Sequence, residues 1–232
     1  RTNKPLIVKF DNKEVFIKEN GEQTTLINEA FIVPMNEIRE TMEYISNYSL
    51  YAYEEEVKQG YITVSGGHRI GICGKAILSN GYIKTIKYIS FINIRIAHEI
   101  KGCSDMLLDK IYKNESEIYN TLIISPPGAG KTTLLRDLIR NISNGNSYIK
   151  NGLNVGIADE RSEIAACYLG VPQNDVGIRT DVLDGVMKAS GIMMLIRTMS
   201  PKVVAVDEIG SIDDINAIKQ GVNCGCSFIC TV

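Results

Sequence analysis

Short stretches of alternating apolar and polar residues dominate the first quarter of the chain. Residues 6–32 hold three such stretches, separated by polar turns, and this pattern predicts strands. Residues 35–59 instead repeat apolar residues at helical spacing, which predicts one helix that ends at Gly60. The residues on its apolar face are Ile38, Met42, Ile45 and Leu50.

Three further strand patterns follow, and the last two flank a strong hairpin turn. The strands are expected at residues 61–64, 69–78 and 82–88, and Ser79-Asn80-Gly81 supplies the turn. Beyond them, an apolar stretch runs from Phe91 to Ile100. Ser104 is then expected to cap a short helix that reaches Lys113.

From about residue 118 the pattern changes to short apolar runs that alternate with helical segments. The run at residues 121–124 predicts a buried strand, and further strands are expected at residues 153–158, 203–206 and 227–232. Helices are expected at four places: after Gly130, at residues 162–169, at residues 181–198 behind a Thr180 cap, and at residues 212–220. Strands that alternate with helices predict a parallel α/β sheet.

These two patterns predict two domains. An amino-terminal α+β domain is expected at residues 1–102, a linker at 103–117, and an α/β nucleotide-binding domain of RecA-like type at 118–232. The chain begins at Arg1 without a methionine and stops inside an apolar run at Val232. We therefore expect a fragment whose second domain is incomplete at its carboxyl end.

The composition is that of an ordinary globular protein, with 44% hydrophobic and 22% charged residues. A net charge of −2 gives no overall attraction to nucleic acid, although a local basic patch stays open. No apolar run is long enough to span a bilayer. The six cysteines form no CxxC pair, which argues against a zinc site. A cytoplasmic protein is expected.

A glycine-rich loop between a strand and a helix carries the strongest chemical signal. Gly128 and Gly130 let the backbone curl so that its N–H groups point at a phosphate, and the helix that follows adds a partial positive charge. Lys131 would reach the terminal phosphates of ATP, and Thr132 would ligate Mg²⁺. The phosphate-binding residues are expected to be Ser125, Pro126, Pro127, Gly128, Ala129, Gly130, Lys131, Thr132 and Thr133. Ser125 stands where the general pattern has its first glycine, and the bland alternative is a glycine-rich turn beside a surface lysine.

Two strands end in carboxylates that a parallel sheet would bring to one edge. Asp207 follows the apolar run 203–206, which is the Walker B pattern, and is expected to bind Mg²⁺. Glu208 is the first candidate for positioning the attacking water, and Glu160 is the second. A plain helix cap for the first pair and a solvated loop for Glu160 are the alternatives.

Five segments give the chain a family resemblance. They are VSGGHRIGICG (64–74), SPPGAGKTTLLRD (125–137), DERSEIAA (159–166), GVPQNDVGIRTDVLDG (170–185) and PKVVAVDEIG (201–210). In these segments the chain resembles the stage III sporulation protein AA family of endospore-forming bacteria. That family is similar to the type II and type IV secretion ATPases, in which an amino-terminal domain joins a RecA-like core.

The resemblance implies a homo-oligomeric, hexameric ring ATPase. It would act on the cytoplasmic, mother-cell side of a membrane-embedded sporulation channel. It also implies that Asp159-Glu160-Arg161 corresponds to the acidic "Asp box" of the secretion ATPases. In those relatives the amino-terminal domain contributes basic residues to the nucleotide site, which makes Arg69 and Arg95 candidate arginine fingers.

Two other functions stay open on the residues alone. The first is a RecA-like motor on nucleic acid, which lacks support because the chain shows no aromatic-basic groove and no net positive charge. The second is a module in which bound ATP orders the ring without being hydrolysed. The expected cofactors are ATP and Mg²⁺, and no nucleic-acid partner is expected.

Overall fold

The computed structural model describes residues 1–10, 13–49 and 53–232, and these fall into two compact units. Residues 1–64 with 68–96 form the amino-terminal unit, and residues 65–67 with 97–232 form the carboxyl-terminal unit. Among the described residues, no helix has the length and apolar character that a membrane crossing requires.

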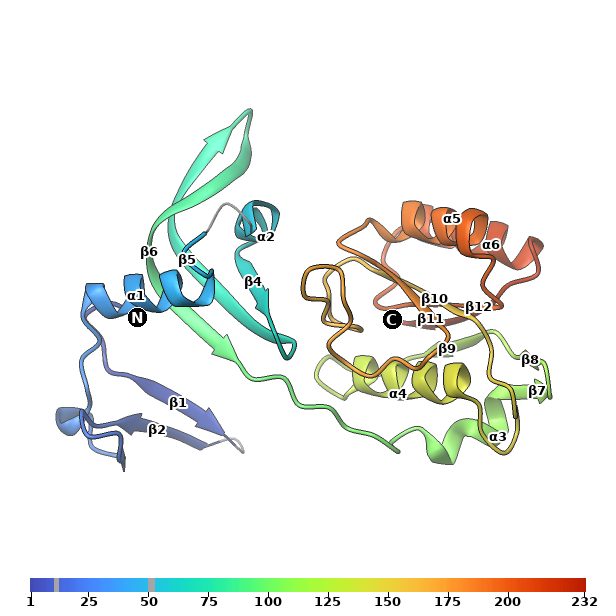
Figure 1. The fold of residues 1–232 in the computed structure, drawn as a ribbon, viewed down its shortest axis with the longest axis horizontal. Coiled ribbons are helices and arrows are strands. Elements are labelled where there is room, and N and C mark those ends of the chain that lie inside the picture. The colour runs from blue at the N-terminus through green and yellow to red at the C-terminus, as the bar shows by residue number, and fades with distance from the viewer. Residues whose placement is uncertain (11–12, 50–52) are drawn as a thin grey trace. The chain divides into compact units, whose positions relative to one another are not determined.

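The amino-terminal unit contains two antiparallel sheets. The first consists of β1 (Ile7–Phe10), β2 (Lys13–Ile17) and β3 (Gln23–Thr24), and the second of β4 (Tyr61–Val64), β5 (His68–Ser79) and β6 (Tyr82–Arg95). A short 3₁₀ helix, η1 (Ile27–Glu29), follows the first sheet. The helices α1 (Met35–Ile45) and α2 (Glu54–Gln59) both pack against β6, the longest strand (Figure 1).

The single helix predicted over residues 35–59 is wrong. The chain leaves the helical conformation at Ser46, because Asn47 and Tyr48 have φ values of +47° and +59°. Helix α2 then starts afresh at Glu54. Leu50, which the prediction placed on the apolar face, lies outside the described residues.

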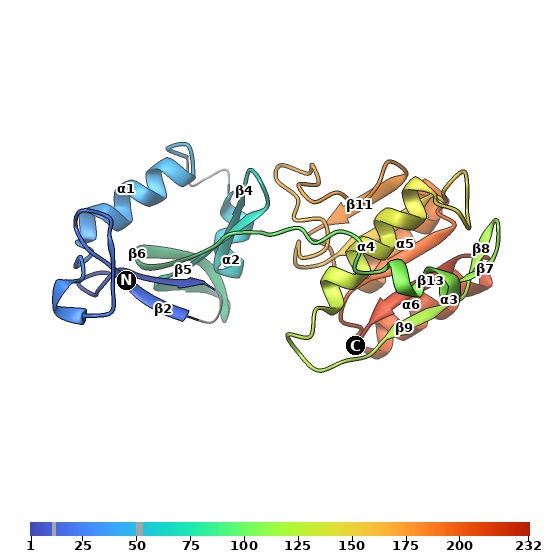
Figure 2. The ribbon, with the colours of Figure 1, turned by 90° about the horizontal axis from the view of Figure 1, so that it is seen from below.

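The carboxyl-terminal unit is built on one parallel sheet of five strands in the order β11-β10-β12-β13-β9. The strands are β9 (Thr121–Ile123), β10 (Val155–Asp159), β11 (Thr180–Asp184), β12 (Val203–Val206) and β13 (Ser227–Thr231). The helices are α4 (Lys131–Asn144) on one face and α5 (Lys188–Met199) and α6 (Ile212–Asn223) on the other (Figures 1 and 2).

Strand β12 lies at the centre of this sheet and is buried on both faces. Val203 and Ala205 belong to the core beneath α4, whereas Val204 and Val206 belong to the core beneath α5 and α6. All four residues are at most 1% exposed. The predicted parallel strand buried on both sides is therefore confirmed, and its carboxyl end delivers Asp207 to the edge of the sheet.

Strand β9 differs from its prediction as a buried strand. It pairs only with β13 among the described residues, and it ends the order of strands in the sheet. Leu122 is consequently 52% exposed. The loop that follows β9 nevertheless leads directly into α4.

Two predicted helices of this unit are also wrong. Residues 180–184 form strand β11 beside β10, so the helix predicted from Asp181 begins only at Lys188. The Thr180 hydroxyl caps no helix and instead donates to the carbonyl of Val176. Residues 162–169 form no helix either. Their N–H groups at Glu163, Ile164 and Ala165 donate to the carboxylate of Asp159 rather than to helical carbonyls.

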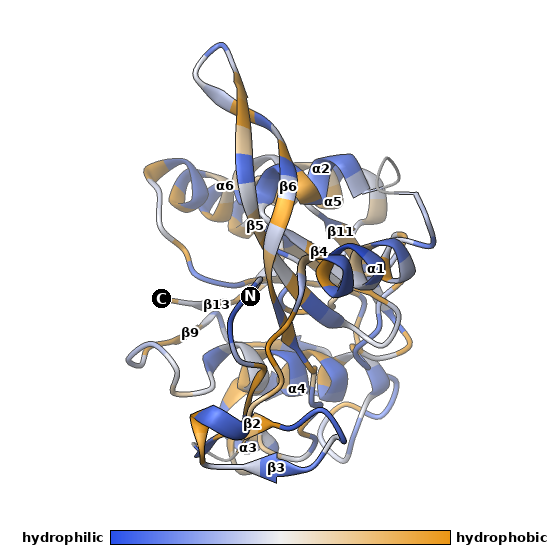
Figure 3. Ribbon diagram, turned by 90° about the vertical axis from the view of Figure 1, so that its left-hand side faces the viewer, coloured by the Kyte–Doolittle hydropathy of each residue, from blue (hydrophilic) through white to orange (hydrophobic). Residues whose placement is uncertain are grey.

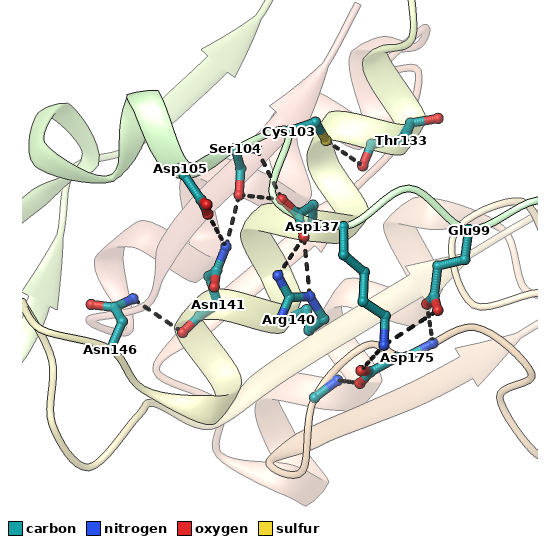
Figure 4. A network of polar contacts seen from close by, with 12 residues as sticks. Glu99, Cys103, Ser104, Asp105, Thr133, Asp137, Arg140, Asn141, Asn146 and Asp175 are labelled. Atoms are coloured by element: carbon teal, nitrogen blue, oxygen red, sulfur yellow. Dashed lines mark hydrogen bonds and ion pairs between the residues drawn. The ribbon is translucent and has the colours of Figure 1, made fainter.

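The segment before β9 is short and irregular. It contains a 3₁₀ turn, η3 (Asp105–Leu107), then α3 (Leu108–Ile111), β7 (Tyr112–Asn114) and β8 (Glu117–Ile118). The helix predicted over residues 104–113 therefore ends early, and Ser104 does not cap it. Both the N–H and the hydroxyl of Ser104 donate to Asp137 Oδ2 on α4, at 2.9 and 2.7 Å (Figure 4).

Candidate functional site

The loop between β9 and α4, residues 125–130, is hereafter called the glycine loop. Gly128 and Gly130 have φ values of +77° and +91°, a conformation that favours glycine, and the space beside each α-carbon is open. The ammonium group of Lys131 donates to the carbonyl oxygens of Ser125 at 2.7 Å and Pro126 at 3.3 Å. Lys131 thus lies across the loop, bonded to groups that a phosphate could replace.

Asp207, which directly follows β12, is hydrogen-bonded to the start of α4. It is only 9% exposed, and its Oδ2 accepts a hydrogen bond of 2.6 Å from the hydroxyl of Thr132 at the start of α4. A hydroxyl and a carboxylate held together in this way are oxygen donors of the type that Mg²⁺ prefers beside phosphates. The residues present therefore fit the ion that the sequence predicted, and Thr132 and Asp207 are the residues that would hold it.

Thr231, at the end of β13, forms hydrogen bonds with both acidic residues that follow β12, Asp207 and Glu208. Its fully buried hydroxyl donates to Asp207 Oδ1 and accepts the N–H of Glu208 at 2.7 Å. Thr231 is not among the site residues predicted from the sequence. The signal in the sequence is a hydroxyl residue near the end of the apolar run 227–232. Only the order of the strands shows that this run lies beside β12.

Glu208 turns away from the strand direction because its φ is +49°. Its carboxylate forms an ion pair with the Arg161 guanidinium at 3.2 Å, and its side chain is 54% exposed. An exposed ion pair of this kind contributes little stability. The carboxylate is therefore held beside the edge of the sheet without being locked there.

The second acidic segment follows β10, at the same edge. Glu160 forms an ion pair with Lys188, the first residue of α5. Asp159 is buried, and burial raises its pKa to about 6. Three backbone N–H groups donate hydrogen bonds to its carboxylate and oppose this shift. We interpret Asp159 as the residue that shapes the loop after β10, with Glu160 presented to the cleft.

A cleft of about 1360 Å³ is lined by some of these residues at the carboxyl edge of the sheet and by many residues of α5, α6 and the segments before them. Its lining includes Ser125, Lys131, Glu160, Arg161, Lys188 and Glu208. Asp207 lies behind it, beside a much smaller cavity that Glu160 and Glu208 also line. Strands that end at the same edge of a parallel sheet commonly form the ligand crevice in this way.

The two candidate arginine fingers belong to the amino-terminal unit. Arg69 on β5 and Arg95 on β6 are direct partners across the two strands. The guanidinium of Arg69 also stacks on the ring of Tyr61, 3.7 Å from its centroid. Their role in the nucleotide site stays a prediction.

The sheet order, with β13 between the glycine-loop strand β9 and the carboxylate strand β12, defines a RecA-like α/β core. Solved structures share this fold. The Legionella pneumophila ATPase DotB matches with a TM-score of 0.54 and 16% identity over 99% of this chain and 59% of that one. The pilus retraction motor PilT, solved with bound ADP, matches with a TM-score of 0.56 and 15% identity over 100% and 61%. The RecA-like core preceded by a smaller α+β unit is thus confirmed.

The family follows from the sequence comparisons. The family model described as sporulation stage III, protein AA, matches residues 1–232, and the chain belongs to that family. It is 51% identical over 187 residues to stage III sporulation protein AA of Bacillus subtilis (strain 168), covering 80% of this chain and 59% of that protein. It is 30% identical over 119 residues to an uncharacterized protein, ycf45, of Cyanidium caldarium, covering 50% and 32%. The chain thus spans about three fifths of the Bacillus relative.

Proposed function

We propose that the carboxyl-terminal unit binds and hydrolyses Mg²⁺-ATP at this cleft. The full-length protein would work as a ring-shaped ATPase on a membrane-embedded sporulation complex. The observation that carries the proposal is the hydrogen bond between Thr132 and Asp207, since it joins the start of α4, directly after the glycine loop, to the carboxylate edge of β12. The family and the likeness of the fold to a secretion-system ATPase and a pilus motor support it.

Each residue has a separate task in this proposal. The N–H groups of the glycine loop and the start of α4 cradle the phosphates, and Lys131 exchanges its loop carbonyls for the terminal phosphate. Mg²⁺ held by Thr132 and Asp207 would neutralise charge on the phosphate oxygens. Glu208 accepts a hydrogen bond from the attacking water and so aligns it, once its ion pair with Arg161 opens.

The test is phosphate release from ATP by the full-length protein with Mg²⁺. Lys131→Ala should lower turnover by about 10²–10³-fold, because one cation aimed at developing charge is lost. Lys150→Ala is the matched control, since Lys150 is exposed and does not line the cleft. Equal phosphate release by Lys131→Ala and the parent would show that the glycine loop does not bind the substrate. A parent that binds ATP without releasing phosphate would favour the non-hydrolysing module.

Assembly has its own test, because the ring is proposed separately from hydrolysis. Specific activity of the full-length protein should rise with its concentration if neighbouring subunits complete the site. Arg95→Ala should lower turnover more than ATP affinity. It is a cleaner change than Arg69→Ala, which also removes the stacking on Tyr61. A fully active monomer with a concentration-independent rate would contradict the shared site.

A further inference from the structure

A long segment of the chain, most of it in the amino-terminal unit, contains no acidic residue. Residues 60–98 hold five of the 25 basic residues of the chain and none of its 27 acidic residues. The five are Arg69, Lys75, Lys84, Lys87 and Arg95. The overall charge of −2 therefore hides a local basic region, and that region coincides with β4, β5 and β6.

Three of these cations gather at the far end of the β5–β6 hairpin. We call residues 75–88 the hairpin tip; it projects beyond the rest of its unit (Figure 1). Lys75 and Lys87 are direct partners across the two strands, and Lys84 follows the turn, with all three exposed. Like charges directly opposite each other destabilise a strand pair. An anion bound between them would relieve that repulsion.

The hairpin tip also exposes large apolar side chains. Leu78 is 63% exposed, Tyr82 80%, Ile83 46% and Tyr88 73%. Figure 3 shows hydrophobic and hydrophilic residues along the same projecting ribbon. Clustered apolar side chains on a soluble surface mark a site of interaction. Among the described residues, no third strand pairs with the distal part of the hairpin, which is a two-stranded ribbon.

We propose that the hairpin tip docks on the surface of a lipid bilayer that carries anionic headgroups. The lysines would contact the headgroups, the tyrosines would lie at the interface, and Leu78 and Ile83 would reach the boundary of the acyl chains. Single-stranded nucleic acid would use the lysines and tyrosines, but it offers nothing to the two aliphatic side chains. The bilayer is therefore the partner that matches the whole tip. This inference does not depend on ATP hydrolysis.

The test is co-sedimentation of the full-length protein with vesicles. Vesicles of phosphatidylglycerol and phosphatidylcholine should bind it, vesicles of phosphatidylcholine alone should bind it far less, and salt should weaken binding. Replacing Lys75, Lys84 and Lys87 together by Gln should lower the affinity by about 100-fold, at about fivefold for each lysine. The combined change Leu78→Ser and Tyr82→Ser should also lower it while the charge stays constant.

The matched control replaces Lys4, Lys9 and Lys13 of the same unit by Gln. These lysines are exposed too, and the ammonium group of Lys9 forms an ion pair of 3.0 Å with the carboxylate of Glu14. The control changes the net charge equally and should keep nearly full binding. Equal losses in the two triple variants, or no preference for anionic vesicles, would overturn the proposal. The proposal would also be overturned if the protein bound a single-stranded oligonucleotide more tightly than anionic vesicles and if only the Lys75, Lys84 and Lys87 variant lost that binding. That result would assign the hairpin tip to nucleic acid.

Discussion

The first turn of α4 and its middle are held by hydrogen bonds of different kinds. At its start, Lys131 and Thr132 bond to loop carbonyls and to Asp207 at the edge of a large cleft. Two turns further on, the Asp137 carboxylate is buried and accepts bonds from Ser104 and Arg140 (Figure 4). The first set uses partners that a nucleotide and its metal can replace, whereas the second is closed to solvent.

The middle of α4 also anchors the segment that precedes the α/β core, because Asn141 donates to the hydroxyl of Ser104 at 2.9 Å. The loop before β11 adds a second anchor, an ion pair of 2.7 Å between the Lys101 ammonium and the Asp175 carboxylate. The difference between the first turn and the middle of α4 teaches that one helix can be fixed to its surroundings and still present exchangeable groups. We therefore expect substitutions at the start of α4 and at the edge of the cleft to change activity. Those at Asp137 should change stability.

The largest effect is expected at the cleft. Glu208→Gln keeps the shape of the side chain but removes its charge, so ATP binding should persist while turnover falls by about 10²–10⁴-fold. Glu160→Gln is the matched control, because Glu160 lies at the same edge and is held by Lys188 rather than Arg161. Steady-state phosphate release and ATP affinity, measured on both variants, check this. Normal turnover in Glu208→Gln with a large loss in Glu160→Gln would reverse the two roles.

The next effect is on stability and concerns the middle of α4. Asp137→Asn leaves Arg140 without its charge partner and should lower the free energy of unfolding by about 3 kcal/mol. The control Asp105→Asn changes an exposed acid on the neighbouring segment and should change the free energy of unfolding by less than about 0.5 kcal/mol. Urea unfolding measures both. Unchanged ATP affinity in Asp137→Asn would sharpen the contrast between the first turn and the middle of α4, and a loss of affinity as large as that of Lys131→Ala would break it.

The pH dependence of stability carries the same contrast. Burial raises the pKa of Asp137, but the hydrogen bonds from Ser104 and Arg140 outweigh it and lower the pKa from 3.8 to about 2. Ionised Asp137 therefore stabilises the fold above about pH 4, and this contribution of about 2 kcal/mol is lost as the pH falls from about 4 to 2. The difference in unfolding free energy between the parent and Asp137→Asn should shrink over that interval. A constant difference would mean that the charge of Asp137 is not what stabilises.

A smaller effect is expected at Thr231. Thr231→Val keeps the volume but leaves Asp207 Oδ1 and the N–H of Glu208 without the hydroxyl that they share. We expect a loss of about 1–2 kcal/mol in stability and about a tenfold fall in turnover, through misplacement of Asp207 and Glu208. Thr231→Ser should restore most of both, since it returns the hydroxyl. Turnover equal to that of the parent in Thr231→Val would show that the hydroxyl does not position the two acids.

The parts of the fold that the sequence predicted are those in which a local pattern coincides with burial. Helix α4 has its apolar stripe because Leu135, Leu138 and Ile139 face the core, and β12 is apolar on both faces because helices cover both. The glycine loop and the pair Asp207-Glu208 could be located in the same way, because the loop directly precedes α4 and the pair directly follows β12. Their roles at a nucleotide stay predictions.

The predictions failed where a distant partner decides the conformation. Residues 180–184 look like a helix start, but their backbone pairs with β10 and forms a partly buried strand at the edge of the sheet. Residues 162–169 were predicted to form a helix, but three of their N–H groups donate to the buried carboxylate of Asp159. Ser104 looks like a cap and instead bonds Asp137, 33 residues away. Thr231 was missed for the same reason, since its role depends on the neighbouring strand.

The most direct test of the account is the stabilisation of the full-length protein by Mg²⁺-ATP, measured as the shift in its unfolding free energy. At about 100 times the dissociation constant, the parent and Lys150→Ala should each gain about 2.7 kcal/mol. Lys131→Ala should have nearly the same stability as the parent without nucleotide and should gain almost nothing with it. An equal gain in Lys131→Ala would contradict the claim that the start of α4 exchanges its internal hydrogen bonds for a nucleotide.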